Sequence, residues 1–268
     1  MELNQEKLKN LTEDLIEWIK ESMKSSGGKS AVIGISGGKD SSVVAALCVK
    51  ALGKENVIGV LMPDGVQSDI SFAEELCEEL DIKNTTVNIE EMSKAFLKSL
   101  NDIKGKIIDD VSRQTILNFP PRIRMTVLYA VSQSIDDSRV INTSNLSEDW
   151  VGYATVYGDT AGAFSPLGML TSDEVMQIGK YLGLSDKFTF KVPSDGLTGQ
   201  TDEDIFGFTY ETLNKYIREG ICEDKDVKKK IDNMHKYSRH KFLPIPMFHA
   251  PIAIIPDDEA GVYKYKTK

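Results

Sequence analysis

The 268-residue sequence has no long apolar run. A helix that crosses a membrane needs about 20 consecutive apolar residues, and no stretch of this chain approaches that length. The first ten residues are polar and include acidic side chains, so they lack the apolar centre of a secretory signal. We therefore expect a cytoplasmic protein that has no membrane partner.

Cysteine is scarce as well. Cys48, Cys77 and Cys222 are far apart, and no Cys-x-x-Cys pair or Cys/His spacing typical of a metal site occurs. This excludes the usual patterns of structural zinc and of iron–sulfur clusters. We expect free thiols in a reducing compartment.

Basic residues are outnumbered by acidic ones, 32 against 41, and the formal net charge is −9. A nucleic-acid-binding protein usually presents a basic face to the phosphate backbone. The Lys-rich stretch at 225–230 is interrupted by Asp226 and reads as the solvated side of a helix. The charge pattern therefore predicts no nucleic-acid partner.

Short apolar segments alternate along the chain with longer segments of helical periodicity. The apolar segments predict strands at 31–35, 57–62, 85–89 and 139–142. The periodic segments predict helices at 3–24, 43–52, 70–80, 92–100, 120–135, 171–182 and 226–234. This alternation is typical of an α/β fold with a doubly wound parallel sheet flanked by helices.

The length suits one domain spanning 1–268. Pro120 and Pro121 are expected in the first turn of their helix, where proline is tolerated. Residues 186–206 are rich in Gly, Ser, Thr and Asp and lack periodicity, which predicts a mobile functional loop. A polar, Pro-containing C-terminal segment is expected over about 236–268.

The strongest motif lies between the first strand and the helix that follows it. Its glycines allow a tight turn and close backbone approach, and the helix start offers free N–H groups and the positive end of the helix dipole. The spacing fits neither Gly-x-x-x-x-Gly-Lys-Ser/Thr nor Gly-x-Gly-x-x-Gly. We predict a phosphate-binding loop made of Gly34, Ile35, Ser36, Gly37, Gly38, Lys39, Asp40 and Ser41.

Asp40 is unusual within such a loop, because a carboxylate repels phosphate unless a cation lies between them. Mg²⁺ commonly takes one or two carboxylates together with phosphate oxygens. Glu148 follows the fourth predicted strand and would lie on the same rim. We therefore predict that Asp40 and Glu148 are catalytic residues that share Mg²⁺. The alternatives are a helix N-cap for Asp40 and a helix-start acid for Glu148.

Ser-Gly-Gly-x-Asp-Ser after a buried strand resembles the pyrophosphate loop of the N-type ATP pyrophosphatases, which have a Rossmann-like, adenine nucleotide alpha-hydrolase-like fold. Further segments, in the same order along the chain, resemble ammonia-dependent NAD synthetases. These segments are Met62–Asp69, Asn118–Met125, Asn142–Glu148, Gly152-Tyr153, Tyr157–Asp159, Pro193–Leu197, Gln200–Asp204 and His240-Lys241. The resemblance covers about residues 5–250.

The resemblance implies a ligase that uses ATP as co-substrate and Mg²⁺ to amidate deamido-NAD through an adenylated carboxylate, releasing AMP and pyrophosphate. It assigns Thr143 and Ser194 to ATP, and Arg122, Asp159, His240 and Lys241 to deamido-NAD. It also implies a homodimer. Only about 30 residues precede the first strand, so free ammonia rather than glutamine is the expected nitrogen donor.

Four positions depart from the pattern of this family: Leu61, Val156, Ala163 and Ser172. The family carries charged side chains there, and these contact ATP or the dinucleotide. Their loss indicates a rearranged pocket or a different carboxylate substrate. Two other functions are left open: another ATP pyrophosphatase, such as a different amide synthetase or a tRNA-modifying sulfurtransferase, and a non-catalytic adenine-nucleotide-binding protein.

Overall fold

A parallel four-stranded sheet forms the centre of the computed structural model, which describes residues 2–67, 69–189 and 201–248. Its strand order is β3-β2-β1-β4. The strands are β1 (Ser30–Gly34), β2 (Val57–Leu61), β3 (Lys83–Thr86) and β4 (Ser138–Val140). All three pairings are parallel, so the carboxyl ends of the strands meet at one edge. The predicted fold class is confirmed.

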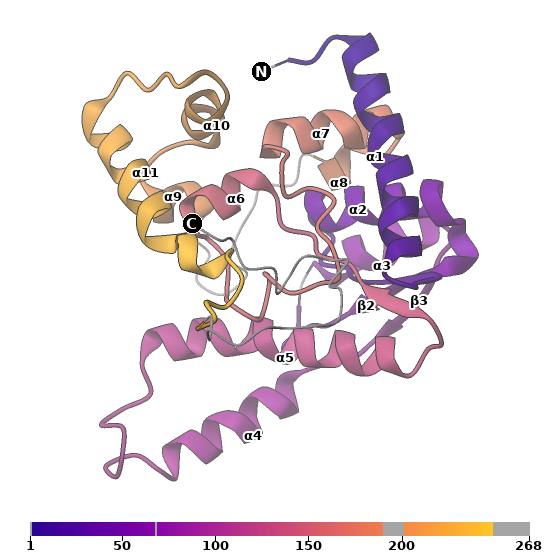
Figure 1. The fold of residues 1–268 in the computed structure, drawn as a ribbon. Coiled ribbons are helices and arrows are strands. Elements are labelled where there is room, and N and C mark those ends of the chain that lie inside the picture. Colours follow the sequence, from indigo (N-terminus) through magenta and orange to yellow (C-terminus); the bar gives the residue numbers. More distant parts are fainter. Residues whose placement is uncertain (1, 68, 190–200, 249–268) are drawn as a thin grey trace.

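Alternate residues of β1 pack on opposite faces of this sheet, as the period of two requires. Ala31 and Ile33 belong to a large apolar cluster with the helices of one face, and Val32 belongs to a second cluster with Val127 and Leu128 on the other. The helices of the first face are α1 (Gln5–Ser25), α2 (Lys39–Leu52), α3 (Ile70–Glu79) and α7 (Ser172–Tyr181), and those of the second are α4 (Glu90–Asn101) and α5 (Arg113–Gln133). Figure 1 shows the sheet between these two groups of helices.

A third apolar cluster lies beside the sheet and contains only helical and loop residues. Phe206 is 1% exposed at its centre, and its ring makes an edge contact with Tyr153 at 4.9 Å between centroids. The helices that supply this cluster are α6 (Leu146–Val151), α9 (Asp202–Phe206), α10 (Tyr210–Glu219) and α11 (Lys225–Ser238). The remaining short elements are η1 (Lys54–Asn56), α8 (Asp186–Thr189) and η2 (Arg239–Lys241).

Several element boundaries differ from the sequence predictions. Pro120 and Pro121 lie inside α5, not in its first turn, because the helix starts earlier at a Ser112 N-cap whose side chain accepts the Thr115 N–H. The predicted loop over 186–206 is wrong at both ends, where α8 and α9 form, and its middle (190–200) lies outside the described residues. β3 is shorter and earlier than predicted. None of the described helices combines the length and apolar character that crossing a lipid bilayer requires.

Candidate active site

The phosphate loop connects β1 to α2 at the carboxyl edge of the sheet. Ile35 continues β1 by donating its N–H to Val60 (3.0 Å), and α2 starts at Lys39 after a Gly38 N-cap. The hydroxyls of Ser36 and Ser41 lie 3.1 Å apart and bridge the two ends of the loop. The loop is therefore closed upon itself, and the first turn of α2 directs backbone N–H groups toward its mouth.

Gly37 sets the shape of the loop. Its φ is +74°, which side-chain-bearing residues rarely adopt. A Cβ atom there would lie 2.9 Å from Cβ of Phe72 and 3.0 Å from the backbone nitrogen of Ala73 on α3. Only glycine lets the loop fold this closely onto α3.

The two predicted metal ligands come together beside this loop. Asp40 lies in the first turn of α2, and Glu148 lies in the first turn of α6, just beyond β4. Lys39 extends between them: its Nζ is 2.8 Å from Oδ2 of Asp40 and 3.7 Å from Oε1 of Glu148. Residues more than 100 positions apart thus form one charged cluster.

Asn145, which the sequence analysis quoted in a motif without giving it a role, links the two carboxylates. It is the N-cap of α6 and is fully buried. Its Oδ1 accepts the N–H groups of Ser147 and Glu148. Its Nδ2 donates to Asp40 Oδ1 (3.0 Å) and to Glu148 Oε1 (2.9 Å). One amide group therefore caps the helix and holds both acids.

Burial and charge act in opposite directions within the cluster. Burial alone would lower the pKa of the Lys39 ammonium, but attraction to Asp40 and Glu148 outweighs it and raises the pKa above its usual value. Burial, reinforced by Asp40, raises the pKa of Glu148 even though Lys39 and the Asn145 hydrogen bond favour its ionised form. The site thus stabilises the charged form of Lys39, whereas it disfavours the ionised form of Glu148.

Asp202 and Tyr210 complete the cluster. Asp202 is 5% exposed, accepts a hydrogen bond from the Tyr210 hydroxyl (3.0 Å), and attracts the Lys39 ammonium. The Tyr210 ring centroid lies 5.7 Å from Lys39 Nζ. Both residues come from the helical cluster beside the sheet, so that cluster closes the site from the side of α9 and α10.

The donor set fits a magnesium ion. Asp40 and Glu148 share one amide donor, and a positively charged nitrogen already lies between them. Among the described residues, no group of three or more His, Cys, Asp or Glu side chains is arranged to hold a metal. These two carboxylates would hold the ion and leave it open to water and phosphate oxygens, which is the usual pattern for Mg²⁺ beside a nucleotide.

Three of the residues predicted to bind the substrate hold the segment that follows α6. Lys241 donates to the carbonyls of Gly152 (2.7 Å) and Ala154 (2.9 Å). The Nε of Arg122 donates to the carbonyl of Val156 (3.1 Å), and Asp159 accepts the Thr155 N–H (3.0 Å). In this conformation these charged groups order the 152–159 segment, which runs beside the predicted substrate site.

The other predicted residues are less well connected. His240 is exposed, and its Nδ1 lies 3.0 Å from the carbonyl of Tyr237. Thr143 is half-buried in the loop after β4. Ser194 lies outside the described residues. Arg124, two residues beyond Arg122, donates from Nε to the carbonyl of Met62 (3.0 Å) at the carboxyl edge of the sheet.

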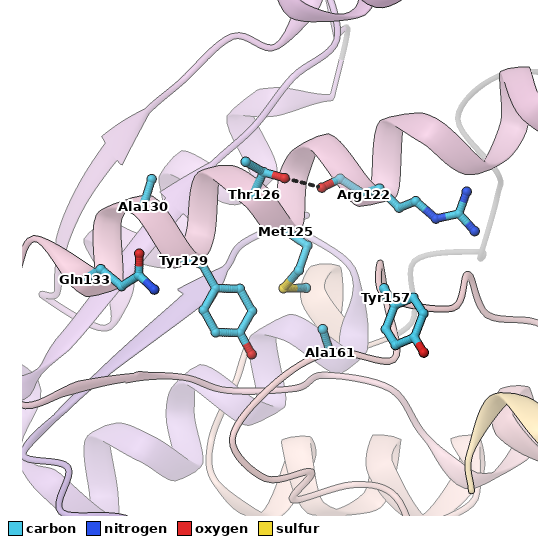
Figure 2. Close-up of a pocket in the computed structure, with 8 residues that line it drawn as sticks. All are labelled: Arg122, Met125, Thr126, Tyr129, Ala130, Gln133, Tyr157 and Ala161. Atoms are coloured by element: carbon cyan, nitrogen blue, oxygen red, sulfur yellow. Dashed lines mark hydrogen bonds between the residues drawn. The ribbon is translucent and has the colours of Figure 1, made fainter. Parts of the chain in front are cut away.

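A pocket of about 550 Å³ lies between α5 and the segment that carries Tyr157 and Ala161. Figure 2 shows the side chains of Met125 and Tyr129 pointing from the helix toward the segment that carries Tyr157 and Ala161. Arg122 lines its rim. This pocket therefore shares one residue with the predicted substrate site and none with the phosphate loop.

Comparison with known proteins agrees with this geometry. The NAD synthase family model matches residues 11–247. The chain belongs to the NAD synthase family. Within it, the NH(3)-dependent NAD(+) synthetase of Methanococcus aeolicus is 41% identical over 210 residues, 77% of this chain and 81% of the relative.

Two solved structures of NAD synthase relatives extend the comparison. The NMN synthetase of Francisella tularensis has a TM-score of 0.80 and 32% identity, covering 94% of this chain and 99% of its own. The NH3-dependent NAD synthetase of Campylobacter jejuni has a TM-score of 0.72 and 32% identity, covering 90% and 98%. These matches confirm the resemblance that the motifs indicated.

The structure of this chain explains two of the positions at which its sequence departs from the NAD synthase pattern. Ser172 begins α7 inside a buried network, where its hydroxyl accepts from Asn214 (3.1 Å) and its N–H donates to the Ser147 hydroxyl (3.0 Å). Leu61 is fully buried at the end of β2. Ser172 and Leu61 therefore contribute to packing between secondary-structure elements, and neither adds a charge to the site.

Proposed function

We propose that this chain catalyses the ATP-dependent amidation of deamido-NAD with ammonia, giving NAD, AMP and pyrophosphate through an adenylated carboxylate. The observation that carries the proposal is the junction of a phosphate loop with two carboxylates held by one buried amide. Curated relatives that are 36–41% identical over most of the chain are named NH(3)-dependent NAD(+) synthetases. That name supports ammonia as the nitrogen donor.

Asp40 and Glu148 are the proposed ligands of Mg²⁺, which would supply charge neutralisation at phosphate oxygens. The loop from Gly34 to Ser41 binds the triphosphate through its N–H groups and hydroxyls, with Thr143 and Ser194 on the nucleoside side. The chain itself positions the substrate carboxylate against the α-phosphate and stabilises developing charge. Because the reaction proceeds by adenylation, it requires no protein nucleophile.

Arg122, Asp159, His240 and Lys241 are the proposed contacts of the pyridine nucleotide. Three of them already hold the 152–159 segment through backbone groups. A guanidinium and an ammonium beside such a segment suit the carboxylate and phosphate groups of this substrate. Burial lowers the pKa of Lys241, while attraction to Asp159 opposes this change.

The direct test is to incubate the purified protein with ATP, Mg²⁺, ammonium and deamido-NAD, and to measure NAD and pyrophosphate. We expect equal amounts of both products, and loss of both in Asp40→Ala. A matched control is Lys29→Met, which removes an exposed ion pair with Asp137 far from the phosphate loop. Absence of NAD with every nitrogen donor, or full turnover by Asp40→Ala, would overturn the proposal.

A second candidate substrate is nicotinate mononucleotide, the acid that an NMN-forming amidation would consume. Two observations favour it: the Francisella structure is that of an NMN synthetase, and four charged positions of the dinucleotide-using pattern are Leu61, Val156, Ala163 and Ser172 here. A mononucleotide lacks the adenylyl half, so it needs fewer such contacts.

The ratio of kcat/KM for the two acids separates these candidates. If the pocket lacks the charged contacts to the adenylyl half, kcat/KM for the mononucleotide should exceed that for deamido-NAD by at least about tenfold. The loss of one hydrogen bond to a charged group is worth about 1.5–3 kcal/mol. Equal or higher kcat/KM for deamido-NAD would reject the mononucleotide. The adenylation chemistry is common to both.

We also propose that the chain forms a homodimer through α4 and α5. Large apolar side chains on these helices are exposed: Met92 (43%), Phe96 (43%), Ile116 (45%) and Tyr129 (38%). Such an apolar surface is typical of an interface. Light scattering of the native protein should give twice the chain mass, and Phe96→Glu should give a monomer. A monomeric native protein at micromolar concentration would reject the interface.

A further inference from the structure

Lys39 has an unusual position for a lysine. It is 5% exposed, although lysine is among the residues least often buried. Its ammonium lies 2.8 Å from Asp40 and 3.7 Å from Glu148, which are the proposed metal ligands. A lysine in a loop that binds phosphate would be expected to direct its ammonium outward toward the ligand, yet the Lys39 ammonium is directed inward to the two carboxylates.

We propose that Lys39 is a built-in counter-cation. Its ammonium occupies the oxygens of Asp40 and Glu148 while the catalytic divalent ion is absent, and it must leave them when that ion binds. This inference rests on the metal site in the proposed function. It assigns Lys39 a role as a positioning residue that controls metal binding.

The distances make the two cations competitors. Mg²⁺ contacts carboxylate oxygens at about 2.0–2.1 Å. An ion at that distance from Asp40 and Glu148 would lie against the Lys39 ammonium, which already contacts Asp40 at 2.8 Å. Two cations this close repel each other strongly in a buried site. The ammonium must therefore move when the oxygens are taken.

The displaced ammonium has other acceptors nearby. Asp202 attracts it, and the Tyr210 ring lies within cation–π distance. Lys39 also adjoins Gly38 at the mouth of the phosphate loop, so the phosphate oxygens of ATP offer it a stronger partner. ATP would then favour displacement of Lys39, and metal and nucleotide would strengthen each other's binding by the same factor.

The test is the affinity for Mn²⁺, measured by the electron paramagnetic resonance of the free ion with no substrate present. Wild type, Lys39→Gln and Lys39→Met are compared, each with and without α,β-methylene-ATP. Without nucleotide, we expect both variants to bind Mn²⁺ about tenfold more tightly than wild type, within the usual range of coupling between sites. The nucleotide should tighten Mn²⁺ binding in wild type and much less in the variants.

Two further variants separate charge from structure. Lys39→Arg keeps the cation and should keep the weak affinity for free Mn²⁺, and Lys29→Met alters only an exposed ion pair and should match wild type. If the Gln and Met variants do not fold, the ¹⁵N signal of the Lys39 ammonium in wild type replaces them. That signal should shift when Mg²⁺ is added with the ATP analogue.

Three outcomes would overturn the inference. The first is free-Mn²⁺ affinity in Lys39→Gln equal to or weaker than that of wild type. The second is an unchanged Lys39 ammonium signal at saturating Mg²⁺ and nucleotide. The third is no Mn²⁺ binding by any protein even with nucleotide, which would also remove the proposed metal site, whereas the first two leave that site intact.

Discussion

Replacing Asn145 with alanine would remove four hydrogen bonds from one fully buried side chain. Two of them cap α6, and two hold the carboxylates of Asp40 and Glu148. The variant therefore tests whether one amide supports both the helix and the acidic pair.

The expected loss can be summed from these contacts. An N-cap contributes about 1 kcal/mol, and each hydrogen bond to a charged group contributes about 1.5–3 kcal/mol. The sum is about 4–7 kcal/mol. Because water can enter the space and solvate the carboxylates, we expect a decrease of about 4 kcal/mol in the free energy of unfolding. That is a large part of the 5–15 kcal/mol typical of a folded protein.

Urea denaturation in EDTA, followed by circular dichroism, measures this loss without interference from metal. The matched control is Thr209→Ala, which removes the exposed cap of α10 and should cost only about 1 kcal/mol. Asn145→Asp keeps a capping oxygen, but it loses both donors and places a third carboxylate beside Asp40 and Glu148, so it should cost at least as much as Asn145→Ala. If Asn145→Ala costs no more than Thr209→Ala, the link between the carboxylates contributes nothing and the reasoning is refuted.

Three further predictions concern the helices around the site. Burial raises the pKa of Asp149 to about 7. The folded state thus keeps a proton that the unfolded state loses near pH 4, so wild type should lose stability between about pH 4 and 7. Asp149→Asn should lose less, since only the raised pKa of Glu148 then acts in this range among the buried acids of α6; parallel urea midpoints for the two proteins would contradict this. Gly152→Ala should cost about 2–5 kcal/mol in thermal unfolding, because its φ is +74° and a Cβ would lie 2.1 Å from Ser238; Ser238→Gly should restore part of the loss. Ser147→Ala should cost about 2–3 kcal/mol in urea, since it leaves the buried Asn214 side chain without the hydroxyl it accepts from at 2.6 Å; a cost below about 0.5 kcal/mol would show that the network relaxes.

The sheet and the phosphate loop could be predicted because each carries a strong local signal. β1 and β2 are continuous apolar runs, as expected for parallel strands buried on both faces. The loop combines glycines with a helix start. Asp40 and Glu148 could be paired from the sequence because parallel strands end at one edge. The structure brings them together as predicted, although their role as metal ligands stays a proposal.

The residues that the sequence analysis missed act through contacts between distant segments. Asp202 and Tyr210 reach Lys39 only because the third apolar cluster packs α9 and α10 beside α6. Asn145 had a local signal, since Asn is a preferred N-cap two and three residues before Ser147 and Glu148, but its second role depends on α2. The inward direction of Lys39 likewise depends on tertiary packing.

Other differences come from signals that compete locally. Pro120 was expected to start α5 because proline lacks an N–H, but the earlier Ser112 cap prevails, and packing buries Phe119 and Pro120 within the helix. The apolar residues Val87 and Ile89 indicated a strand, but they follow β3 and pack beneath α5. The homodimer, magnesium and the cytoplasmic location stay predictions.

The outer edge strand β3 has a consequence for how copies of this protein can associate. All four of its residues, Lys83–Thr86, are exposed and polar, and the strand is only four residues long. Open strand edges normally invite a strand from another molecule, and a short, polar, lysine-bearing edge discourages it. The β3 edge is therefore protected against adding a strand from another molecule, which favours self-association through helical surfaces such as the proposed α4 and α5 interface.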